Sequence, residues 1–363
     1  MWTNVPEFYQ EFCPGDFQTY IKYLKLILTK WPQFNVGAPT SSTLICYIHT
    51  QTGREFFASK IVNQHFTILV NLYQEFLDSE LSLDALNKGP FGWLSPCAQE
   101  TLDIEQFKIN KSESYFGFKS FNDFFHRNLN EDYPYPNVRP IAGLWNDHII
   151  VSIGDFQVHR TEYNIKEETK LYIKNESYSL FDIFAGDSAL SSYFIGGSIL
   201  QGFFHTISYH WFHAPVGGNI IYAKVVPGLL MSLSENHVAV DVDGVNGTMS
   251  EKINYWLSNG QNGFTKSQLY LAHVAVRGIV IIENPTVGKV CALAIGMEEV
   301  SSVTLAQGVS KGQQIKKGEQ LGYFQYGGSS GLVIVDNTQA GKKFGKFQQQ
   351  QQLKMGQQIM DIQ

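Results

Sequence analysis

A serine that directly follows a glycine near the C-terminus carries the first chemical signal. Gly327-Gly328-Ser329-Ser330 lies between a strand-like segment, 322–326, and the apolar run 332–335. Because Gly328 has no Cβ and tolerates strained backbone angles, the Ser329 hydroxyl could turn onto the preceding carbonyl and form an ester. Elimination and hydrolysis would then leave a pyruvoyl group, a carbonyl cofactor made from the chain itself. A flexible loop is the alternative interpretation of such a stretch.

The same serine also fits the pattern Gly-x-Ser-x-Gly, formed by Gly327, Ser329 and Gly331. In an α/β-hydrolase this pattern makes a nucleophile elbow, and the acid and the histidine follow the serine along the chain. The last histidine here is His273, which precedes Ser329. The chain order excludes this class, and any base for Ser329 must come from an earlier segment.

Two histidines in the segment 209–215, Tyr-His-Trp-Phe-His-Ala-Pro, form a second cluster. His210 and His213 would share one face if this segment is helical. They could be a metal pair, which needs a third ligand, or rings packed among aromatic neighbours. They could also transfer protons, since imidazole titrates near neutral pH. The spacing leaves all three interpretations open.

An aspartate, Asp155, ends a β-like segment and could orient one of the two imidazoles. A solvated aspartate in a turn is the alternative. Serine, histidine and aspartate together would form a triad that activates a hydroxyl, with the aspartate fixing the tautomer of the histidine. The sequence leaves open whether the three side chains meet.

The composition indicates a compact globular protein, with 363 residues, 44% hydrophobic and 17% charged. The net charge of -6 provides no basic face for nucleic acid or anionic lipid. The four cysteines are scattered without a Cys-x-x-Cys pair, so they fit neither a disulfide framework nor a zinc site. The start lacks a secretory pattern, and no apolar stretch approaches the roughly 20 residues of a membrane span. We expect a soluble, cytoplasmic protein without stable membrane insertion.

The pattern of apolar residues changes along the chain and predicts an α+β fold. Helical spacing in 16–31 and 56–76 predicts a mainly helical N-terminal extension, 1–110. Beyond it, a β-rich catalytic domain, 111–341, is expected to be a sandwich or barrel, and Lys-Gly steps at 311–312 and 317–318 suggest a hairpin before Ser329. Residues 342–363 are glutamine-rich and predict a solvated tail. The β-like segments are 148–152, 218–226, 237–242, 273–283 and 289–295.

Several separated motifs occur in the order seen in phosphatidylserine decarboxylases, which the chain resembles from about Tyr115 to Val335. The motifs are Ser-Phe-Asn-Asp-Phe-Phe-His-Arg at 120–127, Arg139-Pro140, Gly154-Asp155, Tyr209-His210-x-x-His213-x-Pro215 and the Gly-Ser pair at 328–329. Gly-Pro-Phe-Gly-Trp at 89–93 and Tyr-Phe-Gly-Phe at 115–118 resemble the extension of a soluble branch that acts on free amino acids such as tryptophan.

Two motifs depart from those of the phospholipid enzymes. These enzymes usually carry Leu-Gly-Ser-Thr at the cleavage site, where this chain has Gly-Gly-Ser-Ser, the form associated with the amino-acid branch. Their Pro-Ala-Asp-Gly around the aspartate appears here as Ile153-Gly154-Asp155-Phe156. The aspartate is present, but its immediate setting is altered.

The resemblance implies a pyruvoyl-dependent decarboxylase that converts a free neutral, apolar L-amino acid, such as tryptophan or methionine, into the amine and CO₂. It implies self-cleavage between Gly328 and Ser329, with Asp155 and His213 activating Ser329 and His210 protonating the carbanion. The two fragments would remain associated, and neither pyridoxal phosphate nor a metal would be required. The alternatives are a phosphatidylserine decarboxylase and a β-rich binding module that does not cleave itself.

Overall fold

The computed structural model describes residues 15–34, 47–48, 50–130, 138–167, 178–230, 268–297, 302–339, 341 and 343–362. The β-like segment expected at 237–242 lies outside them.

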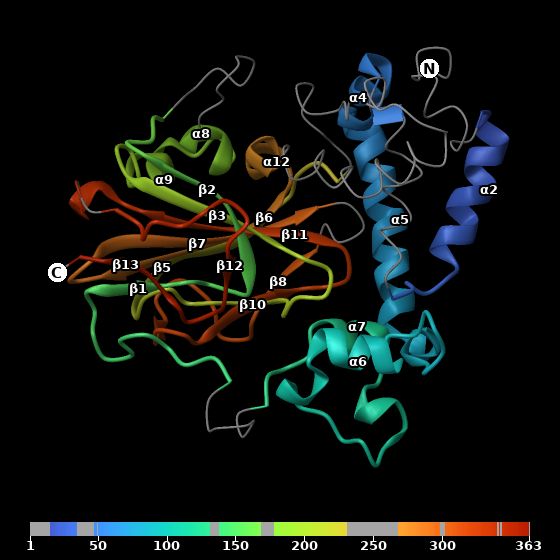
Figure 1. The fold of residues 1–363 in the computed structure, drawn as a ribbon. Coiled ribbons are helices and arrows are strands. Elements are labelled where there is room, and N and C mark those ends of the chain that lie inside the picture. The colour runs from blue at the N-terminus through green and yellow to red at the C-terminus, as the bar shows by residue number, and fades with distance from the viewer. Residues whose placement is uncertain are drawn as a thin grey trace, which may run out of the picture.

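The N-terminal helices follow the predicted periodicity. Helix α2, Phe17–Leu28, begins after Asp16, whose side chain accepts a hydrogen bond from the backbone N–H of Thr19. The second helical stretch is two helices, α4, Gln51–Ala58, and α5, Lys60–Asp78, because the extended backbone of Ser59 interrupts it. Helix α5 stands beside the edge of the β-rich part (Figure 1). Among the described helices, none combines the length and the apolarity that crossing a membrane requires.

A group of short helices follows α5 and packs around Trp93. The Trp93 ring lies 5.4 Å from Phe34, 5.4 Å from Phe121 and 5.7 Å from Phe124 between ring centroids. This core also contains Tyr209 and Tyr326 of the β-rich part, so the helical part packs directly against it. The helices are η2, Glu80–Leu86; α6, Pro96–Leu102; η3, Ile104–Gln106; η4, Ser114–Gly117; and α7, Phe121–Phe125.

The β-rich part is built of antiparallel strands in two main layers. In the described residues, the large sheet has eight strands in the order β12-β2-β3-β11-β7-β6-β5-β9, a smaller sheet has the order β4-β10-β8, and β1 pairs with β13. The strands are β1, Ile149–Val151; β2, Phe156–Tyr163; β3, Ser198–Phe204; β4, Trp211–His213; β5, Gly218–Val226; β6, Val276–Asn284; β7, Gly288–Met297; β8, Val303–Leu305; β9, Gln314–Ile315; β10, Gln320–Phe324; β11, Gly328–Val335; β12, Gln352–Leu353; and β13, Gln358–Asp361.

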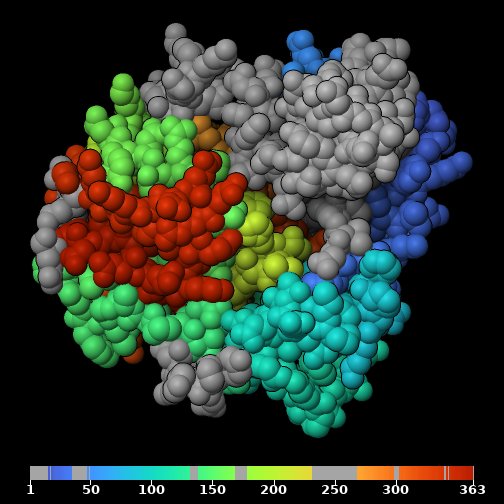
Figure 2. All heavy atoms as spheres, viewed as in Figure 1, coloured from blue at the N-terminus to red at the C-terminus, as the bar shows by residue number. Residues whose placement is uncertain are grey.

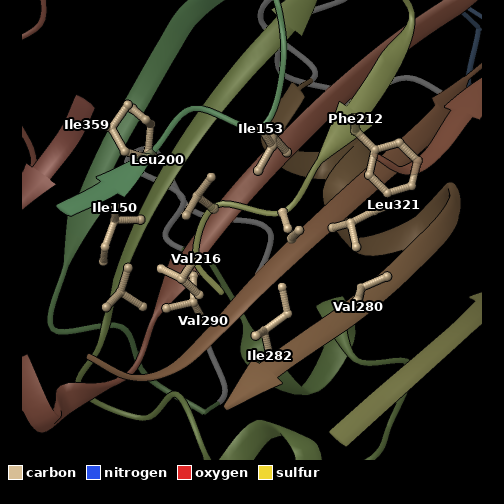
Figure 3. Packing of buried hydrophobic residues seen from close by; sticks show 14 of the residues in the cluster. Ile150, Ile153, Leu200, Phe212, Val216, Val280, Ile282, Val290, Leu321 and Ile359 are labelled. Carbon is tan, nitrogen blue, oxygen red and sulfur yellow. The ribbon is translucent and has the colours of Figure 1, made fainter. Parts of the chain in front are cut away.

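Both faces of the large sheet are buried. Leu332 and Ile334 of β11 face the helices α8, Leu180–Ile183; α9, Ser188–Ser192; and α12, Gln268–Val274. Val333 and Val335 face the smaller sheet, because successive side chains of a strand point to opposite faces. Figure 3 shows this second core, in which Ile153, Phe212 and Leu321 lie close to strands of the large sheet. The α+β prediction is confirmed, and the described strands form layers rather than a closed barrel.

Three expectations about the strands need correction. The hairpin suggested by the Lys-Gly steps at 311–312 and 317–318 is not a tight one, because β8 and β10 pair antiparallel across a long connection in which β9 belongs to the large sheet. The segment expected at 273–283 is the end of α12 followed by β6. The expectation of a solvated tail is corrected too, because β12 pairs with β2 and β13 pairs with β1. The apolar side chains that follow the glutamine run explain this; Leu353, Met355, Ile359, Met360 and Ile362 are all buried.

Candidate active site

Ser329 is the second residue of β11, in the middle of the large sheet. Its Cα pairs with Phe204 of β3 and with Gly296 of β7. The side chain is 0% exposed, and Oγ has no hydrogen-bond partner among the described residues. A buried hydroxyl without a partner is costly to a fold, so its presence here needs an explanation.

The two glycines before Ser329 have different conformations. Gly327 has a φ of 138°, in a region that residues with a side chain rarely adopt. Gly328 begins β11, and a Cβ added there would come no closer than 3.7 Å to Met297. The backbone angle that requires glycine is therefore found at Gly327, one residue before Gly328, for which the sequence predicts tolerance of such angles.

Ser330 points to the opposite face of β11 and is firmly anchored. Its Oγ donates to the Gly202 carbonyl at 2.9 Å and accepts from Gln201 Nε2 at 3.1 Å. The Tyr178 hydroxyl donates to Gln201 Oε1, which orients the amide. The residue that follows Ser329 is therefore fixed on the other side of the sheet.

His210 lies immediately before β4 and is fully buried. Its ring centroid is 3.9 Å from that of Phe125 and 6.5 Å from that of Phe204. Neither ring nitrogen makes a well-aligned hydrogen bond in the described part of the chain, although a contact with the Ser208 backbone acts to raise the pKa of the ring. Burial, with the nearby charge of Arg127, lowers the pKa of His210 well below its ordinary value. Side chains of paired residues share one face of a sheet, so Ser329 lies on the face where Phe204 meets His210.

His213 is the last residue of β4 and has partners on both ring nitrogens. Nδ1 donates to the Gly318 carbonyl at 2.8 Å, which leaves Nε2 to accept from the Tyr209 hydroxyl at 2.9 Å. Burial lowers the pKa of His213 to about 4, so the ring is neutral near pH 7. Because the segment is a strand rather than a helix, His210 and His213 do not share a helical face.

Asp155 directly precedes β2 and is bound by an ion-pair cluster. Arg139 donates to the carboxylate from Nε at 3.0 Å and from Nη2 at 2.6 Å, and Lys354 Nζ lies 3.2 Å from Oδ2. The backbone N–H of Met355 donates to Oδ1 at 2.9 Å. Burial alone would raise the pKa of Asp155, but Arg139, Lys354 and Met355 together hold it below its ordinary value. The carboxylate is therefore ionised near pH 7.

A pocket of about 740 Å³ opens beside this cluster. Tyr209, His213, Arg139 and Met355 line it, together with Lys108. His213 and two partners of Asp155 therefore border this pocket, whereas Asp155 itself does not line it. Ser329 and His210 are not among the residues that line it.

A buried arginine fixes the loop before His210. The Arg127 guanidinium lies 4.1 Å from the centre of the Phe107 ring, and Nη2 donates to the Ile207 carbonyl at 3.2 Å. Nη1 donates to the carbonyl of Phe125, at the end of α7, at 3.4 Å. Burial lowers the pKa of Arg127 to about 9, which leaves the group charged near pH 7.

The structure thus sorts the residues proposed from the sequence into two neighbouring groups. Ser329 and His210 adjoin Phe204, whereas His213 lines the pocket and Asp155 is bound to two of its lining residues, Arg139 and Met355. No hydrogen bond within the described residues joins Ser329 to a histidine or Asp155 to His213, although Asp155 acts on the pKa of His213 through its charge. The roles of the four residues remain predictions.

Sequence reasoning missed several contacts of this site. The Arg139-Pro140 and Tyr209-His210 motifs contain two of the missed residues, so the motifs themselves were the available signal. Lys354 and Met355 gave no local signal, because they follow a run of glutamines. The described residues hold no group of three or more His, Cys, Asp or Glu side chains arranged for a metal ion.

Comparisons with known proteins cover most of the chain. Residues 121–361 match the model of the phosphatidylserine decarboxylase family, and residues 1–102 match a second model of the same description. The chain is 30% identical over 335 residues to the L-tryptophan decarboxylase of Psilocybe cubensis, covering 87% of this chain and 72% of that protein.

Two further relatives have a similar level of identity. The decarboxylase iboD of Amanita muscaria is 30% identical over 316 residues, 84% of this chain and 85% of that protein. The phosphatidylserine decarboxylase proenzyme 2 of Oryza sativa subsp. japonica is 29% identical over 219 residues, 60% of this chain and 30% of that protein. The chain therefore belongs to the phosphatidylserine decarboxylase family and is a carboxy-lyase.

Proposed function

We propose that this protein is a pyruvoyl-dependent decarboxylase of a free neutral, apolar L-amino acid, matured by self-cleavage between Gly328 and Ser329. The observation that carries the proposal is the buried Ser329 hydroxyl, which has no hydrogen-bond partner in the described residues and directly follows a glycine. The proposal assigns residues 1–110 to a helical extension and 111–341 to the catalytic domain, in a protein of the cytoplasm.

Self-cleavage with pyruvoyl formation consumes one water molecule and releases one ammonia molecule. Ser329 Oγ bonds to the Gly328 carbonyl carbon, the C–N bond breaks, and the hydroxyl proton passes to the released amine. Loss of the Ser329 Cα proton then breaks the Cβ–Oγ bond, which frees the Gly328 carboxylate and leaves dehydroalanine. Water converts this residue into the pyruvoyl group and ammonia. The fragments would be 1–328 and 329–363.

The residues around position 329 are compatible with a pyruvoyl group formed from Ser329. Its parent side chain is already buried, and no described contact holds the hydroxyl away from the Gly328 carbonyl. Once formed, the pyruvoyl group supplies the electron-accepting carbonyl for decarboxylation. Neutral His210 has one N–H and one bare nitrogen, so it can both give and accept a proton, and burial shields it from water. His213, with Asp155 acting through its charge, is the proposed base for Ser329.

The proposed substrate class rests on the surroundings of these groups. Aromatic rings of Phe125, Phe204 and Phe324 lie around His210 and the Ser329 face of the sheet. The match to a tryptophan decarboxylase covers 87% of this chain, so it must extend into residues 1–110, whereas the rice phosphatidylserine decarboxylase proenzyme matches 60% of this chain. Apolar surroundings favour an apolar amino acid over a charged one. Phosphatidylserine remains the second candidate, supported by the family match.

The test combines intact mass and product analysis. Purified protein should separate into two fragments under denaturing conditions, and the short fragment should begin with pyruvoyl in place of serine. Ser329→Ala should remain one inactive chain, because the attacking oxygen is gone. Ser191→Ala, which removes another buried hydroxyl, should cleave normally. An intact Ser329→Ala chain with full decarboxylase activity would overturn the proposal, and an uncleaved wild-type chain would indicate a binding module or an arrested precursor.

A further inference from the structure

The turn before the proposed cleavage site is held by side chains of the helical part. The backbone N–H of Tyr326 donates to Asn122 Oδ1 at 3.2 Å, and its carbonyl accepts from Gln74 Nε2 at 3.3 Å. Asn122 Nδ2 donates to Gln74 Oε1 at 2.9 Å and closes the ring of hydrogen bonds. We call this arrangement, Gln74, Asn122 and the Tyr326 backbone, the amide clamp. It joins α5 and α7 to the turn that follows β10.

The amide clamp is buried and reinforced. Asn122 is 0% exposed and Tyr326 is 1% exposed. Asp78 accepts from Asn122 Nδ2 at 2.9 Å and from Gln325 Nε2 at 3.0 Å, so one carboxylate ties the clamp to the preceding residue of the turn. The hydrogen bonds among Gln74, Asn122 and Tyr326 are buried, so losing one would leave a buried polar group unsatisfied, whereas the contacts of Asp78 are partly or fully open to water.

The ring of Tyr326 is held by the same helix as its backbone. Phe121 and Phe125 of α7 meet it edge to face, with centroids 5.4 Å and 5.3 Å away. Phe125 also packs on His210 at 3.9 Å. Helix α7 therefore positions both the turn before the cleavage site and one of the two candidate histidines.

Only Gly327 separates the amide clamp from Gly328, whose carbonyl Ser329 would attack. On the other side, Ser330 is anchored to Gly202 and Gln201. The peptide bond to be cleaved thus lies in a short segment that is fixed at both ends. A reacting carbonyl misplaced by about 1 Å can slow such a reaction by about 100-fold.

We infer that Gln74 and Asn122 are positioning residues for self-cleavage, through which the helical part holds the Gly328 carbonyl in reach of Ser329. The inference rests on the proposed self-cleavage. It gives the helical part a function in maturation, because the clamp joins α5 and α7 to the cleavage segment across more than two hundred positions of sequence. A loosened turn should slow ester formation.

The test compares variants in newly synthesised full-length protein. Gln74→Met keeps the length of the side chain and removes the hydrogen bonds to Asn122 and to the Tyr326 carbonyl. Gln99→Met is the matched control, because Gln99 donates to the Leu94 carbonyl within the helical part and makes no hydrogen bond to the turn among the described residues. Cleavage into 1–328 and 329–363 is followed by intact mass, and the melting temperature of each precursor reports its folding. Gln74→Met should cleave about 10-fold to 100-fold more slowly, and Gln99→Met at the wild-type rate.

A second variant keeps the test decisive if Gln74→Met folds poorly. Gln74→Glu retains an acceptor for Asn122 but lacks the donor for the Tyr326 carbonyl, and it should also slow cleavage. A merely structural role would slow cleavage only in proportion to lost folded protein, so the rate is compared at matched folded fraction. If both folded Gln74 variants cleave at the wild-type rate, the amide clamp does not position the cleavage site. This result would not contradict self-cleavage itself. If wild-type protein and Gln99→Met never cleave, both the proposed self-cleavage and the positioning role of the amide clamp are wrong.

Discussion

The carboxylate of Asp155 accepts a hydrogen bond from the backbone N–H of Met355 at 2.9 Å, across 200 positions of sequence. Under the proposed cleavage, Asp155 would lie in the long fragment and Met355 in the short one. The contact would then join the two fragments at the candidate active site. Figure 2 shows the C-terminal residues, in red, packed against the green residues around position 150.

The two fragments should stay together after cleavage. The short fragment would contain β11, which pairs with β3 on one side and β7 on the other, and also β12 and β13. Cleaved protein should therefore elute from a sizing column at the position of uncleaved Ser329→Ala and separate only in denaturant. Loss of the short fragment under native conditions would contradict this prediction.

The two histidines should affect different steps. His213→Ala, and to a smaller degree Asp155→Asn, should slow self-cleavage by about 100-fold or more, because removing a general base costs at least this much. His210→Ala should cleave yet decarboxylate poorly. Exposed His148 provides the control, and His148→Ala should do both normally. Intact mass and product release measure the two steps separately. If His210→Ala blocks cleavage and His213→Ala does not, the assignment is reversed.

Acidification should destabilise the uncleaved Ser329→Ala chain between pH 6.5 and pH 4. The pKa of His213 is about 4 in the folded chain against 6.5 ordinarily, so in this window the unfolded chain binds a proton that the folded chain does not. The contribution of His213 to the free energy of unfolding is complete above pH 6.5, and roughly 3 kcal/mol of it is lost by pH 4. The lowered pKa values of His210 and His273 act in the same direction.

Urea unfolding of Ser329→Ala at a series of pH values measures this dependence. Adding His213→Asn should make the curve shallower between pH 6.5 and pH 4. Asp155, whose folded pKa is also lowered, loses its contribution only at still lower pH, below its ordinary value of 3.8, so it does not obscure the window. Equal slopes with and without His213 would refute the assigned shift.

The protein should release CO₂ from apolar free amino acids much faster than from phosphatidylserine. Apolar pockets discriminate weakly, by about 1–3 kcal/mol per methylene, so more than one such amino acid should react. A panel of free amino acids and phosphatidylserine vesicles, with amine products identified by mass spectrometry, gives the ranking. Sedimentation with anionic vesicles is the parallel measurement, and the protein should stay in the supernatant. If the protein decarboxylates phosphatidylserine in vesicles but no free amino acid, phosphatidylserine becomes the favoured substrate.

Much of the local structure was readable from the sequence. The strand predicted at 218–226 is β5 with the same bounds, and the helix predicted at 16–31 contains α2. Periodicity and capping act over a few residues, so a short window contains the necessary information. The Gly-Ser pair and the histidine motif likewise identified the candidate chemistry before any fold was known.

The tertiary structure decided which of these groups meet. Neither the pairing of Met355 with Asp155 nor the amide clamp on Tyr326 leaves a local pattern, because each joins segments that only the folded chain brings together. The unpartnered nitrogens of His210 and the position of Ser329 inside a strand likewise leave no local pattern in the sequence. The sequence determined which reactive side chains are available. Long-range burial and strand pairing determined their partners, their ionisation and their access to the pocket.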